Sequence, residues 1–147
     1  MAGAGGGCAQ PYIFFRGRCE EATAFYRERL DADVLMLMRC SDAPDMPSGE
    51  KLVGMADRVM HACLKMNGGN VMMSDGMQRG SAELESVSLS LALPDEGAAR
   101  RYFDALARDC EVRMPVGRTF FSPCFGAVKD KFGLGWMVIV EPDEMVA

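Results

Sequence analysis

The stretch 11-PYIFFRGRCEEATAFYRERL-30 decides the fold, because it joins a predicted strand to a predicted helix. Residues 11–15 are aromatic or β-branched after the proline, which is typical of a strand. Residues 19–30 carry apolar side chains at the three- and four-residue spacing of one helix face. The stretch therefore predicts a strand followed by an amphipathic helix.

Three more strands complete a first unit after this helix. Residues 34–40, 58–66 and 70–74 are rich in Val, Met and Leu, and a turn at Gly68-Gly69 is predicted between the last two. The order of elements in this half is therefore βαβββ.

The second half repeats that order. When the sequence is shifted by 77 positions, Phe25-Tyr26 falls on Tyr102-Phe103, so we interpret the chain as an internal duplication. The predicted elements of this half are a strand at 86–93, a helix that Pro94 and Asp95 open and that runs through about Ala107, and strands at 111–118, 120–128 and 136–141.

The connection 41–57 within the first half is longer than most. It contains Pro44, Pro47 and two glycines. A lid over a pocket and an arm that contacts a second subunit both fit this composition, and a disordered insertion is the alternative.

Composition excludes several classes of function. The chain of 147 residues is expected to form one domain, 1–147, and its net charge of −5 is spread without a basic cluster. This argues against nucleic acid or an anionic membrane as a partner. No apolar run approaches the ~20 residues that a membrane-spanning helix needs, so no membrane insertion is expected.

Six cysteines show no CxxC spacing, and their neighbours do not suggest a zinc cluster. The first residues, MAGAGGGCAQPY, lack the basic and apolar regions of an export signal. We therefore expect a cytoplasmic protein with reduced thiols.

Alternation along the strands assigns residues to faces. Leu89, Leu91 and Leu93 share one face of their strand, which we expect to pack under the helices, while Ser88 lies on the other face. In the same way His61, the only histidine, is expected on the side away from the helices. A register error of one residue would reverse both assignments.

Three motifs carry a resemblance to a known superfamily: 11-PYIFFRGRCEEATAFYRERL-30, 58-RVMHACLKMNGGNVMMSDG-76 and 119-TFFSPCFGAVKDKFGLGWMV-138. The chain resembles the vicinal-oxygen-chelate superfamily of glyoxalases, extradiol dioxygenases and bleomycin resistance proteins, and most of all its PhnB-like branch. The resemblance implies an α+β fold of two tandem βαβββ modules, 10–75 and 86–141, that form a cupped, mostly antiparallel sheet arrangement in a homodimer.

The superfamily also implies a divalent metal ion, bound by residues of the first and last strands of the modules. Its ligand positions fall on Pro11, Ser88 and Met137, which offer one weak hydroxyl, so no metal cofactor is expected. A shifted metal site that uses His61 and Glu141, and perhaps Asp75, is the alternative. Members of the branch are often labelled demethylubiquinone methyltransferases, but the sequence has no glycine-rich strand-to-helix turn suited to S-adenosylmethionine.

Five residues are candidates for binding a small-molecule ligand: His61, Ser88, Phe121, Met137 and Glu141. His61 is also the only candidate catalytic base, although the interpretation we favour is a strand histidine that donates to a neighbouring carbonyl or carboxylate. Phe121 is expected either in a pocket wall or in a dimer contact, and Trp136 is expected in the core.

Three functions stay open at this point. The first is a metal-independent protein that binds a small organic molecule in the cup. The second is an enzyme, either a metal-dependent lyase or dioxygenase that uses His61 and Glu141 or a metal-free catalyst that uses His61. The third is a non-catalytic dimeric scaffold whose cup is filled by methionine side chains.

Overall fold

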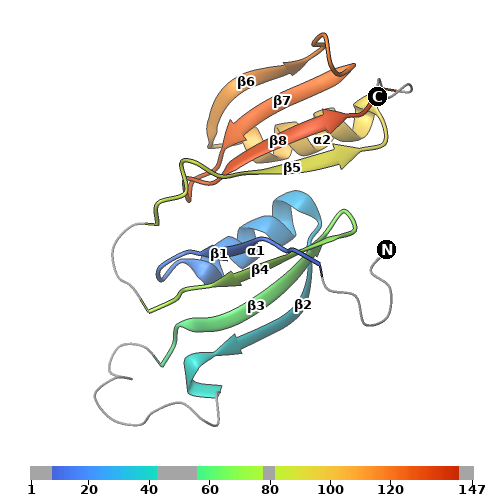
Figure 1. The fold of residues 1–147 in the computed structure, drawn as a ribbon. Helices are drawn as coiled ribbons and strands as arrows, with labels where there is room; N and C mark the ends of the chain where they lie inside the picture. Colours follow the sequence, from blue (N-terminus) through green and yellow to red (C-terminus); the bar gives the residue numbers. More distant parts are fainter. Residues whose placement is uncertain (1–7, 43–55, 78–81, 143–147) are drawn as a thin grey trace.

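The structure is a computed structural model that describes residues 8–42, 56–77 and 82–142. The first module has the predicted βαβββ order (Figure 1). Its elements are β1 (Tyr12–Phe14), α1 (Cys19–Leu30), β2 (Asp33–Arg39), a short 3-10 helix (Cys40–Asp42), β3 (Val59–Met66) and β4 (Gly69–Ser74).

The second module repeats the arrangement, with β5 (Ser88–Leu93), α2 (Glu96–Ala107), β6 (Glu111–Gly117), β7 (Cys124–Lys129) and β8 (Gly135–Val140). Each module contains one four-stranded sheet, ordered β1-β4-β3-β2 in the first and β5-β8-β7-β6 in the second. In each module the strand that comes first in the sequence pairs in parallel with the strand that comes last, β1 with β4 and β5 with β8. The other pairs are antiparallel. The prediction of an α+β fold built from two similar modules is confirmed.

The helices cover one face of the sheets, and strands β1 and β5 face each other where the modules meet (Figure 1). Leu91 and Leu93 of β5 are buried on the helix side, whereas Ser88 and Ser90 are exposed on the opposite side, as the alternation predicts. Trp136 is 1% exposed and belongs to the core, which confirms its predicted role. The opposite faces of the sheets are much less covered, and this is where a ligand or a partner has access.

The hairpin between β3 and β4 turns one residue earlier than the sequence prediction. Met66 pairs with Gly69, so the two-residue turn consists of Asn67 and Gly68 rather than Gly68-Gly69. Both turn residues have positive φ, 47° and 85°, as a type I′ turn requires. Asn-Gly is the most favourable dipeptide for this turn, and its preference determines the register.

The strand predicted at 120–128 is wrong at its beginning, because β7 starts only at Cys124. The preceding residues form a turn in which Ser122 N donates to Thr119 Oγ1 at 3.1 Å and Thr119 N donates to Ser122 O at 2.9 Å. The hydroxyl of Thr119 competes with the sheet for these backbone groups. Phe121 consequently lies in a loop and not on a strand.

The turn between β7 and β8 of the second module contacts the first module through its side chains. Asp130 in this turn is 4% exposed, and its Oδ2 accepts hydrogen bonds from Tyr26 Oη of α1 at 2.5 Å and from Trp136 Nε1 at 2.8 Å. Phe132 packs edge-on against Phe15 and Phe25 of the first module, with ring centroids 5.6 Å apart in both pairs. The DKFG segment of the third motif is therefore the structural connection between the modules.

The helices also contact each other at their C-terminal ends. Arg29 of α1 donates to the carbonyl oxygens of Ala105 and Arg108 at 2.7 and 2.8 Å. A cation at the C-terminus of α2 also interacts favourably with the helix dipole. Together with the Asp130 turn, this contact fixes the orientation of the modules.

Two further sequence predictions concern the long connection in the first module and membrane insertion. Residues 43–55, most of the segment for which a lid or a dimer arm was predicted, lie outside the described residues. Among the residues that are described, neither helix is long and apolar enough to cross a membrane.

Candidate functional site

The only histidine forms a pair with a tyrosine on the open face of the first sheet. Tyr12 Oη lies 3.0 Å from His61 Nδ1, and the ring centroids are 5.6 Å apart. The two residues belong to β1 and β3, which flank β4, so the tyrosine side chain reaches across β4 to the imidazole. The prediction that His61 projects from the side away from the helices agrees with this contact.

A groove runs along β1 beside this pair. One hollow of about 300 Å³ is lined by Pro11, Tyr12, Phe14, Glu83 and Val87, among others. A second hollow of about 270 Å³ lies on the other side of Phe14 and is lined also by Met77. Arg16 borders both hollows. We call the two together the β1 groove.

The walls of the β1 groove are mainly apolar and partly exposed. Tyr12 is 42% exposed, Phe14 is 51% exposed, and their rings lie 5.1 Å apart. An apolar concavity with a few convergent polar groups is the usual composition of a small-molecule site. The Tyr12 hydroxyl is the polar group that connects the groove to His61.

The other predicted ligand-binding residues lie elsewhere. Ser88 begins β5 and is exposed, Met137 is half-buried between Ser90 and Ala127 in the second sheet, and Glu141 follows β8 in an exposed position. None of these residues, nor His61 or Phe121, lines the two hollows of the β1 groove. Among the described residues, no hydrogen bond or ion pair joins Ser88, Phe121, Met137 or Glu141 to His61.

Tyr12 and Phe14 were not predicted as site residues. The alternation of Tyr12, Ile13 and Phe14 does place the two aromatic rings on one face, opposite the buried Ile13. However, a strand of three residues carries too little pattern to show which face is buried. Nothing in the sequence indicates the contact between Tyr12 and His61, which are 49 residues apart.

Both carboxylate oxygens of Asp75 accept hydrogen bonds from the protein backbone. Its Oδ1 accepts from the N–H groups of Gly17 and Cys19 at 2.7 and 2.8 Å, and its Oδ2 accepts from Val59 N at 2.8 Å. It therefore takes over the capping of α1, whose N-cap residue Arg18 makes no side-chain cap. The carboxylate has a structural role at the start of α1.

The donor set does not fit a divalent metal ion. Across residues 8–42, 56–77 and 82–142, no three His, Cys, Asp or Glu side chains form a group that could hold one. His61 Nδ1 is engaged by Tyr12, and the superfamily's ligand positions provide Pro11, Ser88 and Met137. A metal site needs at least three converging N, O or S donors.

The thiol of Cys19, at the start of α1, is not a reactive group. Cys19 is fully buried, and burial raises the pKa of its thiol to about 12. All six cysteines are free of disulfides, and Cys63 of β3 is half-buried. A nucleophilic pair of Cys63 and His61 has no hydrogen bond to support it among the described contacts.

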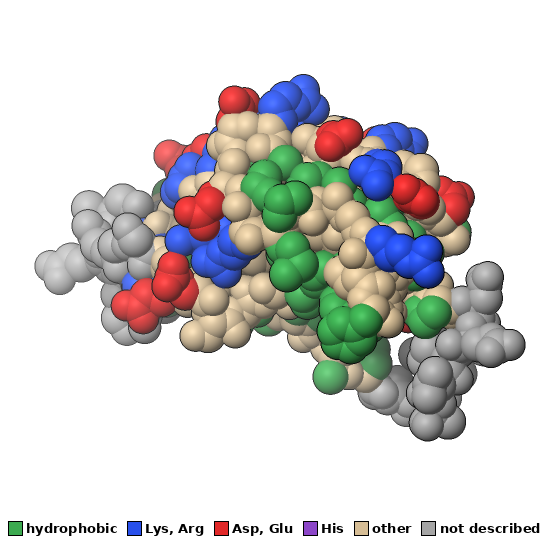
Figure 2. All heavy atoms as spheres, turned by 90° about the horizontal axis from the view of Figure 1, so that it is seen from above, with side chains coloured by type: hydrophobic (Ala, Val, Ile, Leu, Met, Phe, Trp, Pro, Cys, Tyr) green, Lys and Arg blue, Asp and Glu red, His purple; other side chains and the backbone are tan. Residues whose placement is uncertain are grey.

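Large hydrophobic side chains are also exposed at the outer part of the second module. Val112 and Met114 of β6 are 43% and 46% exposed, Phe121 is 41% exposed, and Phe120 is 99% exposed. Figure 2 shows hydrophobic side chains gathered in the middle of the face seen from above, with charged side chains around them. We call these four residues the β6 patch.

Comparison with known proteins identifies relatives over nearly the whole chain. The family described as 3-demethylubiquinone-9 3-methyltransferase matches residues 8–139. The protein YjdN of Escherichia coli strain K12 is 33% identical over 138 residues, which cover 88% of this chain and 92% of that protein.

Solved structures give the same result. A putative 3-demethylubiquinone-9 3-methyltransferase, PhnB protein, from Bacillus cereus is 26% identical with a TM-score of 0.71, and the match covers 91% of this chain and 99% of that one. A glyoxylase/bleomycin resistance protein/dioxygenase domain from Frankia sp. EAN1pec shares the fold, with 17% identity, a TM-score of 0.64 and coverage of 95% and 94%. The chain therefore belongs to the PhnB-like family described as 3-demethylubiquinone-9 3-methyltransferase, and it has the fold of the glyoxylase/bleomycin resistance protein/dioxygenase domain.

Proposed function

We propose that this protein binds a small organic molecule in the β1 groove without a metal ion, and that the Tyr12–His61 pair recognises a polar group of that molecule. The observation that carries the proposal is the 3.0 Å contact between Tyr12 Oη and His61 Nδ1 beside an apolar hollow. The combined volume of the hollows suits a metabolite of modest size.

The pair offers one hydrogen-bond partner to a ligand in either tautomer of the imidazole. If Tyr12 donates to Nδ1, the proton of His61 lies on Nε2 and can be donated onward. If Nδ1 carries the proton and donates to Tyr12, the tyrosine hydroxyl is free to donate to the ligand. A ligand with a carbonyl or carboxylate oxygen satisfies both arrangements.

The superfamily's metal chemistry is not part of this proposal. Two observations support leaving it out: no three His, Cys, Asp or Glu side chains form a group among the described residues, and both oxygens of Asp75 accept from backbone N–H groups. The enzyme that would use His61 and Glu141 as metal ligands is therefore the alternative that the geometry supports least.

Methyl transfer, which the family description names, finds no fitting cofactor site in the turn between β1 and α1. A strand-to-helix turn that holds an adenosylated cofactor needs backbone N–H groups that are available to it. In the turn between β1 and α1, the N–H groups of Gly17 and Cys19 both donate to Asp75. We derive no step through S-adenosylmethionine.

The functional unit in this proposal is a homodimer that uses the β6 patch. Four large hydrophobic side chains between residues 112 and 121, one of them 99% exposed, form the kind of surface that usually contacts a partner. A second copy of the chain is the simplest partner because it brings the same patch in a symmetric contact.

A thermal-shift screen tests the binding proposal. Wild type, Tyr12→Phe and His61→Ala are each measured with a panel of small organic acids, ketones and alcohols, and separately with divalent metal ions. A ligand that binds only the folded state raises the melting temperature. We expect at least one organic compound to do so in wild type, with a reduced shift in both variants.

The same screen separates the alternatives. A metal ion that stabilises wild type but not His61→Ala would support the metal-dependent enzyme and contradict the proposal. A shift of equal size in wild type and both variants would place the ligand away from Tyr12 and His61. No stabilising compound at all would favour the scaffold.

A further inference from the structure

Three aromatic rings lie in a row on the open face of the first sheet. Phe14 and Tyr12 of β1 have ring centroids 5.1 Å apart, and His61 of β3 follows at 5.6 Å from Tyr12. Tyr12 lines one hollow of the β1 groove, and Phe14 lines both. We call these three residues the aromatic row.

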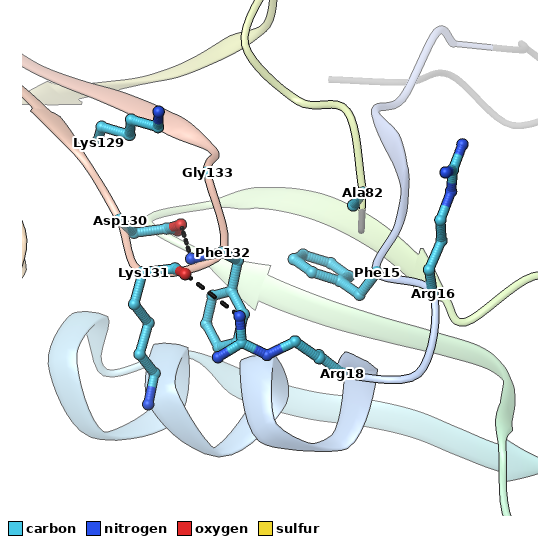
Figure 3. Close-up of a pocket in the computed structure, with 9 residues that line it drawn as sticks. All are labelled: Phe15, Arg16, Arg18, Ala82, Lys129, Asp130, Lys131, Phe132 and Gly133. Atoms are coloured by element: carbon cyan, nitrogen blue, oxygen red, sulfur yellow. Dashed lines mark hydrogen bonds between the residues drawn. The ribbon is translucent and has the colours of Figure 1, made fainter. Parts of the chain in front are cut away.

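The rings of the aromatic row are arranged differently from the buried rings at the junction of the two modules. Their planes make angles of 34° and 37°. Phe15, the next residue along the chain, is 2% exposed and packs against Phe132 at the junction (Figure 3), where the two planes make an angle of 83°. Rings that meet edge to face cover each other, whereas rings of similar inclination leave room for a flat molecule to lie along them.

The aromatic row is exposed on a strand that is otherwise buried. Tyr12 and Phe14 are both exposed, whereas Ile13 between them is 5% exposed. The strand therefore presents aromatic surface outward, in place of the polar residues that are usual on the solvated face of a sheet. An exposed apolar surface that continues over neighbouring side chains marks a binding site.

Two rings of the row are held in position before any ligand binds. A Cβ on Gly76 would lie 3.0 Å from Cδ1 of Phe14, so the Phe14 ring packs directly on the backbone of this glycine. Gly76 is itself fixed, because its N–H donates to Ser74 Oγ at 2.9 Å. The 3.0 Å contact with His61 Nδ1 fixes the ring of Tyr12. Rings that are oriented in advance lose little conformational freedom when a ligand stacks on them.

We propose that the ligand of the β1 groove is a planar aromatic compound with an oxygen acceptor, stacked along Phe14 and Tyr12 with its acceptor at the Tyr12–His61 pair. This inference rests on the proposed function and adds the chemical class of the ligand. A contact between two aromatic rings is more favourable than its buried area alone provides, so the row discriminates flat from puckered compounds. Val87 and Met77, which line the hollows, add hydrophobic contact for either kind.

A pair of matched acids tests the ligand class. Naphthoate is flat, and its fully saturated analogue, decahydronaphthoate, carries the same carboxylate on a puckered ring system. Their dissociation constants are measured by calorimetry for wild type, Phe14→Leu and Tyr12→Phe. Wild type is expected to bind naphthoate about three- to tenfold more tightly than the saturated acid. Most of this preference should disappear in Phe14→Leu, because leucine keeps the hydrophobic contact and removes the ring.

Tyr12→Phe separates recognition of the carboxylate from stacking. This variant keeps the ring and loses the hydroxyl, so it should weaken binding of both acids and leave their ratio unchanged. Leu35→Ala, which trims a 56% exposed apolar residue of β2, and Lys65→Gln, which removes an exposed lysine of β3, are the matched controls, since neither residue lines the β1 groove. Both controls should bind as wild type does.

The NMR signals of the ligand give a second readout. Protons that lie over the face of an aromatic ring shift upfield, so the signals of naphthoate should move upfield on binding to wild type and less on binding to Phe14→Leu. No binding of naphthoate, equal affinity of wild type for the two acids, or a preference that survives Phe14→Leu would overturn the inference. Equal affinities that Tyr12→Phe weakens would overturn the aromatic class alone and leave the proposed function intact.

Discussion

At the scale of single residues, Glu21 connects the two modules through charge. Its carboxylate receives hydrogen bonds from Arg18, the N-cap residue of α1, and its Oε2 lies 3.0 Å from Lys131 Nζ in the turn between β7 and β8. The hydrogen bonds from Arg18 and then from Lys131 lower the pKa of Glu21 to about 2. The junction should therefore respond to acid.

The first prediction is that Glu21→Gln lowers the free energy of unfolding by about 0.5–1 kcal/mol at pH 7, the worth of an exposed ion-pair network. A carboxylate with a lowered folded pKa stabilises fully above its unfolded pKa, about 4.3, and loses this contribution as the pH falls through about 2. Urea denaturation between pH 7 and pH 2 should show the difference between wild type and variant shrinking below about pH 4.5.

Glu28→Gln is the control for this experiment, since Glu28 is an exposed glutamate of the same helix. It should change the free energy of unfolding less at pH 7. A Glu21→Gln difference that stays constant down to pH 2 would contradict the assigned cause.

The sequence predicts some of these residue-level features and not others. The side of β5 that carries Ser88 follows from strict alternation over several residues, and the structure agrees. The partner of His61 does not follow, because Tyr12 approaches it only after β4 has been placed between β1 and β3. Contacts between distant strands depend on sheet order, which alternation alone does not determine.

At the scale of elements, the hairpin between β3 and β4 depends on the backbone conformation of Gly68. Its φ of 85° favours glycine, while an added Cβ would meet no heavy atom within 4 Å. The cost of a side chain at this position is therefore conformational strain alone.

The second prediction follows from this geometry. Gly68→Ala is expected to lower the free energy of unfolding by about 1 kcal/mol. Gly117→Ala at the end of β6 is the matched control, because Gly117 also has open space around its Cβ position but no left-handed φ. Equal effects of the two substitutions in thermal or urea denaturation would count against a strained turn.

The boundaries of helices and strands show where a side-chain hydrogen bond overrides the hydrophobic pattern of the sequence. The hydrophobic spacing of residues 19–30 matches α1 in full, and the Pro94-Asp95 signal predicts the start of α2, where the Asp95 side chain accepts from Ala98 N. The early start predicted for β7 fails because the Thr119 hydroxyl closes a turn within an aromatic segment that otherwise has strand character. Side-chain hydrogen bonds of this kind are hard to anticipate from hydrophobicity.

At the scale of the whole molecule, Asp130 holds the modules together through Tyr26 and Trp136. Burial, and next the nearby charge of Asp130, raise the pKa of Tyr26 well above its usual value, so the phenol stays a donor. The buried carboxylate of Asp130 therefore accepts hydrogen bonds from a side chain of each module.

The third prediction concerns this acceptor. Asp130→Asn would place an N–H donor against other donors, and it should lower the free energy of unfolding by about 2–4 kcal/mol. Tyr26→Phe should cost about 1–2 kcal/mol alone and clearly less in the Asp130→Asn background, because the two residues share one hydrogen bond. Strict additivity in this double-mutant cycle would show that the contact does not couple the modules.

The fourth prediction concerns the proposed homodimer. Wild type should elute as a dimer in size-exclusion chromatography with light scattering, and Phe120→Asp should shift it to a monomer, because a charge at the centre of an apolar contact is costly. Asp104→Lys on the exposed side of α2 changes the charge more than Phe120→Asp does, and it should nevertheless leave the dimer intact. A wild-type monomer, or an unchanged dimer in Phe120→Asp, would argue against a role for the β6 patch.

The central claim is that Tyr12 and His61 act together on an organic ligand in the β1 groove. The most direct test is the affinity of the compound that stabilises wild type most in the thermal-shift screen, measured by calorimetry for wild type, Tyr12→Phe and Lys65→Gln. Loss of one hydrogen-bond partner of the ligand predicts an affinity about tenfold lower in Tyr12→Phe and no change in Lys65→Gln. An affinity in Tyr12→Phe equal to that of wild type would contradict the claim.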